Sequence, residues 1–197
     1  MRSRPGRASR RCTSGKGSNV TRHYLSVTTA GAVTESRSEI AEVGADNCAI
    51  GRRPNGLVSR GSTDCDDQLG RFFCEIAHLE AASVTAFEQL GDELEHAGAP
   101  ASLVAAARRS AREEVTHTEL TGALARRFGA QAQAPRIDPR ASRDLFELAL
   151  DNASEGCVRE TFGALLAHHQ ALRAADEGIR AAMVTIADDE TRHAELS

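Results

Sequence analysis

Aromatic residues are scarce in this chain of 197 residues, which has no tryptophan, one tyrosine and six phenylalanines. Sheet cores depend on aromatic and β-branched side chains, whereas Ala and Leu, which dominate the last two thirds of the sequence, favour helices. The length is sufficient for one domain with a substantial core. The composition therefore predicts an all-α fold.

Cysteine pairs and long apolar runs are also missing. The five cysteines are odd in number and include no Cys-x-x-Cys, so neither a zinc knuckle nor a disulfide framework is indicated. A reducing compartment, and hence a cytoplasmic location, is the default expectation. No run of 18 apolar residues exists, so the sequence predicts no membrane span.

Charge is distributed unevenly along the chain. Residues 1–66 carry a net charge of +5 and residues 67–197 one of −9. The first segment is rich in Arg, Ser, Thr and Gly without sustained periodicity, and we expect a disordered tail there, followed by one folded domain. No aromatic residues interleave with the arginines, which argues against a nucleic-acid contact.

Apolar residues at helical spacing predict four helices from Asp67 onward. Gly98-Ala99-Pro100 supplies a stop and a restart, and Asp176 is a plausible N-cap for the last helix. Residues 129–141 contain Gly and two Pro and are long enough to cross the length of a bundle. Two antiparallel hairpins joined by a long crossover are expected, with helices over roughly 67–97, 100–128 and 177–197 and a third helix that starts at 138 or 142 and ends near 169.

One decamer occurs twice. "AREEVTHTEL" (111–120) and "ADDETRHAEL" (187–196) are identical at five of ten positions, including a Glu and the His three residues later. The likeness extends upstream, where Glu80, Phe87 and Leu90 align with Glu155, Phe162 and Leu165. Each half of the domain therefore carries one Glu on its first helix and Glu-x-x-His on its second.

The spacing places these residues at one height of the bundle. Glu80 and Glu114 are 34 residues apart, Glu155 and Glu190 are 35 apart, and both midpoints fall at or close to predicted turns. Residues three apart share a helix face, so each His points the same way as its Glu. Four carboxylates and two imidazoles form the ligand set of di-iron and di-manganese carboxylate bundles. The predicted metal ligands are Glu80, Glu114, His117, Glu155, Glu190 and His193.

Alternatives remain at several positions. Glu160 lies five residues after Glu155 and aligns with Thr85, so it could be an additional ligand, a switching ligand or a supporting group. Glu113 and Asp189 precede the proposed ligands by one residue, which favours ion pairing or support of the ligands. Other histidines are expected on surface turns or the outer surface, namely His78 and His96, each in a further Glu-x-x-His, and His168 and His169. The simplest alternative is a pair of amphipathic helices with solvated Glu and His.

The stretches "LEAASVTAF", "REEVTHTEL", "SEGCVRET", "DDETRHAEL" and "GAPASLV" resemble the ferritin-like superfamily, and more narrowly small bacterial ferritin-like domain proteins of uncharacterised function. The resemblance covers residues 67–197. It implies a four-helix bundle that holds two iron ions, with manganese as an alternative, and reacts with dioxygen or peroxide. A ferroxidase, a peroxidase and an oxygenase all remain open.

Three further readings are kept. The bundle could store iron or bind it without catalysis, and it could form a homodimer. Only four residues follow His193. Because the last turn of a helix lacks internal hydrogen-bond partners, a truncated bundle with weakened metal binding is also considered.

Overall fold

The computed structural model describes residues 18–27, 33–43, 51–58 and 65–197. Contacts divide the chain into two compact units, residues 1–49 and residues 50–197. No helix in the described part of the chain is both long enough and apolar enough to cross a bilayer.

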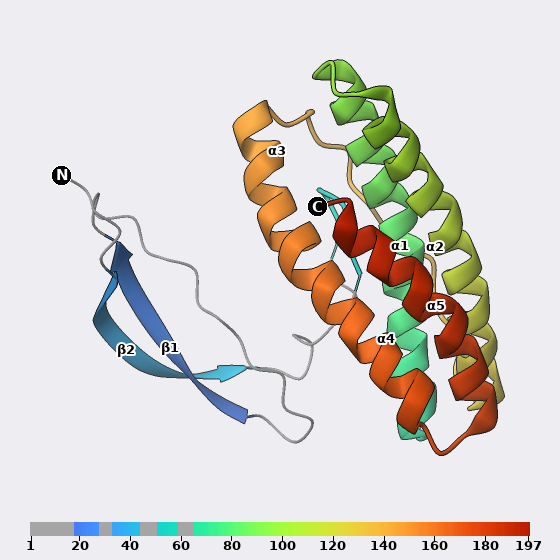
Figure 1. Ribbon diagram of the computed structural model, residues 1–197. Helices are drawn as coiled ribbons and strands as arrows, with labels where there is room; N and C mark the ends of the chain where they lie inside the picture. Colours follow the sequence, from blue (N-terminus) through green and yellow to red (C-terminus); the bar gives the residue numbers. More distant parts are fainter. Residues whose placement is uncertain (1–17, 28–32, 44–50, 59–64) are drawn as a thin grey trace. The chain divides into compact units, whose positions relative to one another are not determined.

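The first unit contains a β-hairpin. Strand β1 (Ser18–Val27) pairs antiparallel with β2 (Val33–Val43), with Ser18 opposite Val43 and an irregularity between Tyr24 and Leu25 (Figure 1). The expectation of a tail without a fold is corrected for these two segments. Their β-branched Val, Thr and Ile residues favour strands. This preference does not appear as a helical periodicity, which is the pattern from which the helices were predicted.

The second unit is helical, and the all-α prediction is confirmed for residues 65–197. Helices α1 (Gln68–His96) and α2 (Ala101–Arg127) are followed by a crossover over residues 128–144. Three consecutive elements, α3 (Leu145–Asp151), η2 (Asn152–Glu160) and α4 (Thr161–Arg173), then form one continuous rod, which we call the third helix (Figure 1). Its middle element η2 is a π-helix. Helix α5 (Glu177–Glu195) completes the unit.

Local chemistry explains where the helices begin and end. Asp67 caps α1 by accepting from the backbone N–H of Leu69 at 2.7 Å, and Asp176 caps α5 as expected. Asp144 and Glu147 form a capping box at the start of α3. Gly98, with φ of 70°, allows the turn after α1.

Two apolar clusters lie on either side of the middle of the helices. Helix α1 contributes Phe73 to one cluster and Phe87 to the other, and α2 contributes Leu124 and Ala107 in the same way. Helix α1 packs along α2, α4 packs along α5, and α2 contacts α5 (Figure 1). The residues between the two clusters on each helix therefore meet in the interior.

Residues 51–58, which we call the strap, pack on the helices. The Ser83 hydroxyl of α1 donates to the carbonyl of Arg52 at 2.8 Å, and the N–H of Arg53 donates to Glu155 of η2 at 3.2 Å. Leu57 forms a β-bridge with Ile137 of the crossover. Because the strap lacks periodicity, the sequence predicts that it belongs to the tail. In the structure its backbone is hydrogen-bonded to residues distant in sequence, so the helical unit begins before the predicted boundary at Asp67.

Candidate metal centre

Six ionisable side chains meet in the middle of the helical unit, and each is at most 1% exposed. They provide two overlapping groups whose ligand atoms lie within 4.8 Å of one another. The groups share two carboxylates, Glu114 of α2 and Glu190 of α5. The first group is Glu80, Glu114, His117 and Glu190, and the second is Glu114, Glu160, Glu190 and His193.

The structure brings together five of the six residues predicted as ligands, and Glu155 is not among them. The Glu155 carboxylate instead accepts from the backbone N–H of Arg53 at 3.2 Å and pairs with Arg159 at 2.9 Å. Glu160, which the sequence left open as an additional ligand, occupies the interior position with no exposed surface. Assigning Glu155 to the metal centre is therefore corrected to Glu160.

The π-helical geometry of the third helix bears on this choice. Glu155 and Glu160 both lie in η2, whose wider turn differs from the regular α-helical register on which the sequence repeat depends, so the contacts of each side chain decide which one belongs to the cluster. The sequence repeat aligned Phe162 and Leu165 with buried residues of α1, but these side chains are 39% and 65% exposed. The structural counterparts of Glu80, Ser83 and Phe87 are instead three buried residues at the same mutual spacing, Glu160, Gly163 and Ala167.

Each histidine is oriented by a carboxylate from the opposite hairpin. The Nε2 atom of His117 lies 3.1 Å from Asp189 of α5, and Nε2 of His193 lies 3.0 Å from Glu113 of α2. These contacts place the Nε2 proton toward the carboxylate and turn Nδ1 of each ring toward the cluster. Such outer partners commonly orient metal-binding histidines. The sequence predicts ion pairing or a supporting role for Glu113 and Asp189, and in the structure each carboxylate contacts Nε2 of a cluster histidine.

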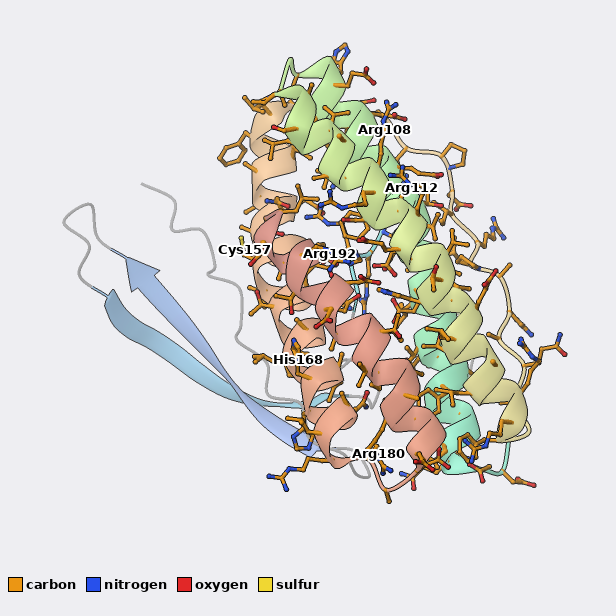
Figure 2. All side chains as sticks on the ribbon, turned by 45° about the vertical axis from the view of Figure 1, so that its right-hand side comes forward. Arg108, Arg112, Cys157, His168, Arg180 and Arg192 are labelled. Atoms are coloured by element: carbon orange, nitrogen blue, oxygen red, sulfur yellow. The ribbon has the colours of Figure 1, made fainter. Side chains whose placement is uncertain are left out.

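Arg192 joins the two supporting carboxylates at the edge of the site. Its guanidinium bonds Glu113 at 2.9 Å and also Asp189. Figure 2 shows Arg192 on α5, with His168 and Cys157 on the third helix. Because one cation pairs with carboxylates of both hairpins, it fixes the pair that orients the two imidazoles.

The interior atoms of the cluster lack hydrogen-bond partners. Both carboxylate oxygens of all four glutamates and Nδ1 of both histidines are buried without one. Buried polar atoms are nearly always paired, and a group of orphaned atoms of this kind calls for a ligand. Four carboxylates balance the charge of two divalent cations. The donor set therefore fits a pair of metal ions.

The pKa shifts of the metal-free cluster have the same origin. Burial, and then repulsion from Glu114 and Glu190, raises the pKa of Glu80 well above its usual range. Burial followed by the charges of Glu190 and Glu114 does the same for the pKa of Glu160. Without a metal ion, these two carboxyl groups therefore bind protons more readily than an exposed glutamate does.

The histidines respond in the opposite sense to their surroundings. Burial by itself lowers their pKa, but the carboxylates of Glu114 and Glu190 outweigh it, so the pKa of His117 rises to about 12 and that of His193 to about 10. For Glu114, burial raises the pKa, but the two imidazoles, whose Nδ1 atoms lie 3.5 Å (His117) and 3.1 Å (His193) from its carboxylate oxygens, lower it to about 2. The cluster thus takes up protons where cations would bind.

The other histidines lie outside the cluster. His168 and His169 are exposed, as predicted. His78 is not on a surface turn, because it is 7% exposed and its Nδ1 lies 2.8 Å from the carbonyl of Gln133 in the crossover. The crossover covers this face of α1, and the local sequence pattern could not show that.

The end of α5 keeps its two cluster residues in the interior. Helix α5 extends to Glu195, and the carbonyl of His193 is 3.3 Å from the N–H of Leu196. Glu190 and His193 are at most 1% exposed. The last turn is thus completed by its own backbone contacts, and both side chains stay in the interior.

Comparison of the chain with protein-family models, with curated proteins and with solved structures found no match. The candidate function therefore depends on the residues of the site.

Proposed function

We propose that this chain is a ferritin-like, di-iron carboxylate protein that acts in oxidation or peroxide handling, with manganese as the alternative metal. The observation that carries the proposal is the pair of overlapping ligand groups that share Glu114 and Glu190. Each group adds one further glutamate and one histidine. This is the composition of di-iron and di-manganese carboxylate sites in helical bundles.

The donor types support iron or manganese. Structural zinc sites are tetrahedral and rich in Cys or His, whereas each group here offers three carboxylates and one imidazole. Oxygen-rich sets of this kind suit metals that favour higher coordination numbers. Four ligand residues per metal ion leave positions open for a small molecule.

The residues of the chain have separable roles in this proposal. Glu114 and Glu190 would contribute to holding both ions, while Glu80 with His117 and Glu160 with His193 would each contribute to holding one of them. A bound iron pair would supply electron exchange with dioxygen or peroxide. Asp189 and Glu113 keep the Nε2 protons in place, and the surrounding apolar clusters exclude bulk water.

Elemental analysis after anaerobic loading with ferrous iron tests the proposal. We expect about two irons per wild-type chain, because the chain provides two ligand groups. Glu114→Ala removes a ligand from both groups and should abolish or strongly reduce binding. Glu119→Ala, on the same helix but exposed, is the matched control and should keep both ions.

Exposure of the loaded protein to oxygen separates an oxidation catalyst from a simple carrier. A near-ultraviolet band that appears with oxygen and is absent from Glu114→Ala supports the proposal. Bound iron that does not react with dioxygen or peroxide favours the alternative of storage or structural binding. Absence of metal uptake by the wild type contradicts both. The homodimer stays a prediction that sedimentation analysis can test.

A further inference from the structure

Arg52 of the strap is a buried arginine close to the metal centre. It is 2% exposed, and its guanidinium carbon lies 5.6 Å from the centre of the Phe87 ring. The same ring is 4.9 Å from the ring of His193. Phe87 thus packs between the guanidinium and a predicted metal ligand.

The backbone around Arg52 leaves room for its guanidinium. Nη2 bonds the side-chain carbonyl of Asn152 on η2. A Cβ added at Gly156 would lie 2.2 Å from Oγ of Ser197, 2.6 Å from Nη2 and 2.7 Å from Oδ1 of Asn152, so a side chain at this position would force the guanidinium and its partner Asn152 to shift, together with Ser197. Ser83 holds the carbonyl of Arg52, and Arg159 donates to the carbonyl of Gly51 at 3.2 Å. Contacts on both sides of the strap therefore fix Arg52.

Part of the Arg52 guanidinium lacks an acceptor. Nε and Nη1 are buried without a hydrogen-bond partner. The Asp151 carboxylate is 3.9 Å from Nη1, which is beyond hydrogen-bond distance, and Asp151 also pairs with Arg143 at 2.5 Å. Leaving buried, charged N–H groups unpaired is costly, so a missing acceptor is expected at this position.

Glu160 is close enough to interact with Arg52 electrostatically but does not pair with it. Its charge is the strongest of those that favour the charged form of Arg52, against the effect of burial. Among the described residues, no ion pair within 4.0 Å joins the two, and both Glu160 oxygens lack partners. The carboxylate thus stays free for a metal ion, and unpaired N–H groups remain in its vicinity.

We propose that Arg52 is the anchor of an anion site, in which a small monovalent anion such as a carboxylate binds the metal ion held by Glu160 and His193 and accepts from the Arg52 guanidinium. The inference rests on the proposed metal pair. With two divalent ions the four glutamates are neutralised, so the charge of Arg52 favours one added anion. The open positions on the metal provide its second contact.

Arg53 provides a control in the same strap. Its backbone N–H donates to Glu155, and its charge acts on Arg159. It is therefore placed on the Glu155 side of the third helix. Arg53→Met removes the same charge from the strap as Arg52→Met does, but from the side chain whose charge acts on Arg159.

The test is a titration of the metal-loaded, full-length protein with azide and with formate, followed by the absorption of bound ferrous or cobaltous ions. Loss of two charge-assisted hydrogen bonds should weaken anion binding by about tenfold to hundredfold in Arg52→Met. Arg53→Met should remain within about twofold of the wild type. Gly156→Ala keeps the arginine but displaces it, and should weaken anion binding as well.

Metal content measured on the same samples separates the two hypotheses. Two ions per chain with equal anion affinity in the wild type, Arg52→Met and Gly156→Ala overturns the anion site alone. The anion site alone is also overturned if the metal-loaded wild type binds neither azide nor formate. Failure of the wild type to bind metal overturns the proposed function instead. If Arg52→Met does not fold, Arg52→Lys and Gly156→Ala decide the question, because both retain the positive charge and lose the geometry.

Discussion

Replacing Glu160 by Gln should have opposite effects on the metal-free and metal-loaded protein. In the metal-free state the Glu160 oxygens are buried without partners, and burial, Glu190 and Glu114 raise the pKa of this acid well above its usual range. An unfolded glutamate has a pKa of about 4.3, so at neutral pH folding must either bury a charge or take up a proton at this position. Glu160→Gln removes this cost and should raise the free energy of unfolding of the metal-free protein by about 1–3 kcal/mol, the usual penalty for an unsatisfied buried group.

Metal ions should stabilise the Glu160→Gln protein less than they stabilise the wild type. A metal ion at 100 times its dissociation constant stabilises the native state by about 2.7 kcal/mol. Losing the ion held by Glu160 and His193 should therefore reduce the metal-induced increase in melting temperature by about 5–10 °C for a domain of this size. Thermal unfolding with and without manganese, followed by circular dichroism, measures both effects.

Glu155→Gln is the matched control on the same helix. Glu155 contacts the N–H of Arg53 and the side chain of Arg159 at the surface of η2, so its loss should cost about 1 kcal/mol in both states and leave the metal content at two. If Glu155→Gln lost one ion and Glu160→Gln kept both, the orientation of the third helix and the ligand assignment derived from it would be refuted.

Three further predictions concern the surroundings of the site. Asp189→Ala should weaken metal binding by about tenfold to hundredfold, because Nε2 of His117 loses its orienting carboxylate; unchanged affinity in a competition titration would contradict this. The metal-free pKa values of about 12 for His117 and about 10 for His193 mean that metal ions displace protons, so metal affinity should rise with pH up to about 10, and the metal-free protein should lose stability as the pH rises from about 6.5 towards 10. Dissociation constants that do not depend on pH would argue against the buried cluster. Phe87→Ala should lower the free energy of unfolding by about 3–5 kcal/mol in urea, since the ring is fully buried; a change below about 1 kcal/mol would mean that the ring is not packed in the core.

The helices of the second unit were predictable because their signals are local. Asp67 and Asp176 accept hydrogen bonds from N–H groups two or three residues away, and Gly98 adopts a positive φ next to the helix that it ends. The strands β1 and β2 also carry a local signal, their β-branched residues, but this signal does not appear as a helical periodicity.

Five residues of the buried cluster were also predictable from sequence. Helices α1, α2 and α5 are regular, so equal distances from a turn place Glu80 level with Glu114, and a spacing of three places His117 and His193 beside their glutamates. The third helix contributes only one residue, a glutamate, to the predicted set. That single position is where the prediction was wrong.

The sequence by itself determined the helical class of residues 65–197, the approximate limits of α1, α2 and α5 and the two Glu-x-x-His pairs, since each follows from contacts within a few residues. Only the tertiary structure decided that Glu160 rather than Glu155 faces the interior, and that Arg52 reaches the same interior from the strap. Helix direction depends on rotation accumulated through η2, and the strap is held by Ser83 and Glu155, far away in sequence. Neither relation is expressed in a local pattern, because both arise only when the helices pack together.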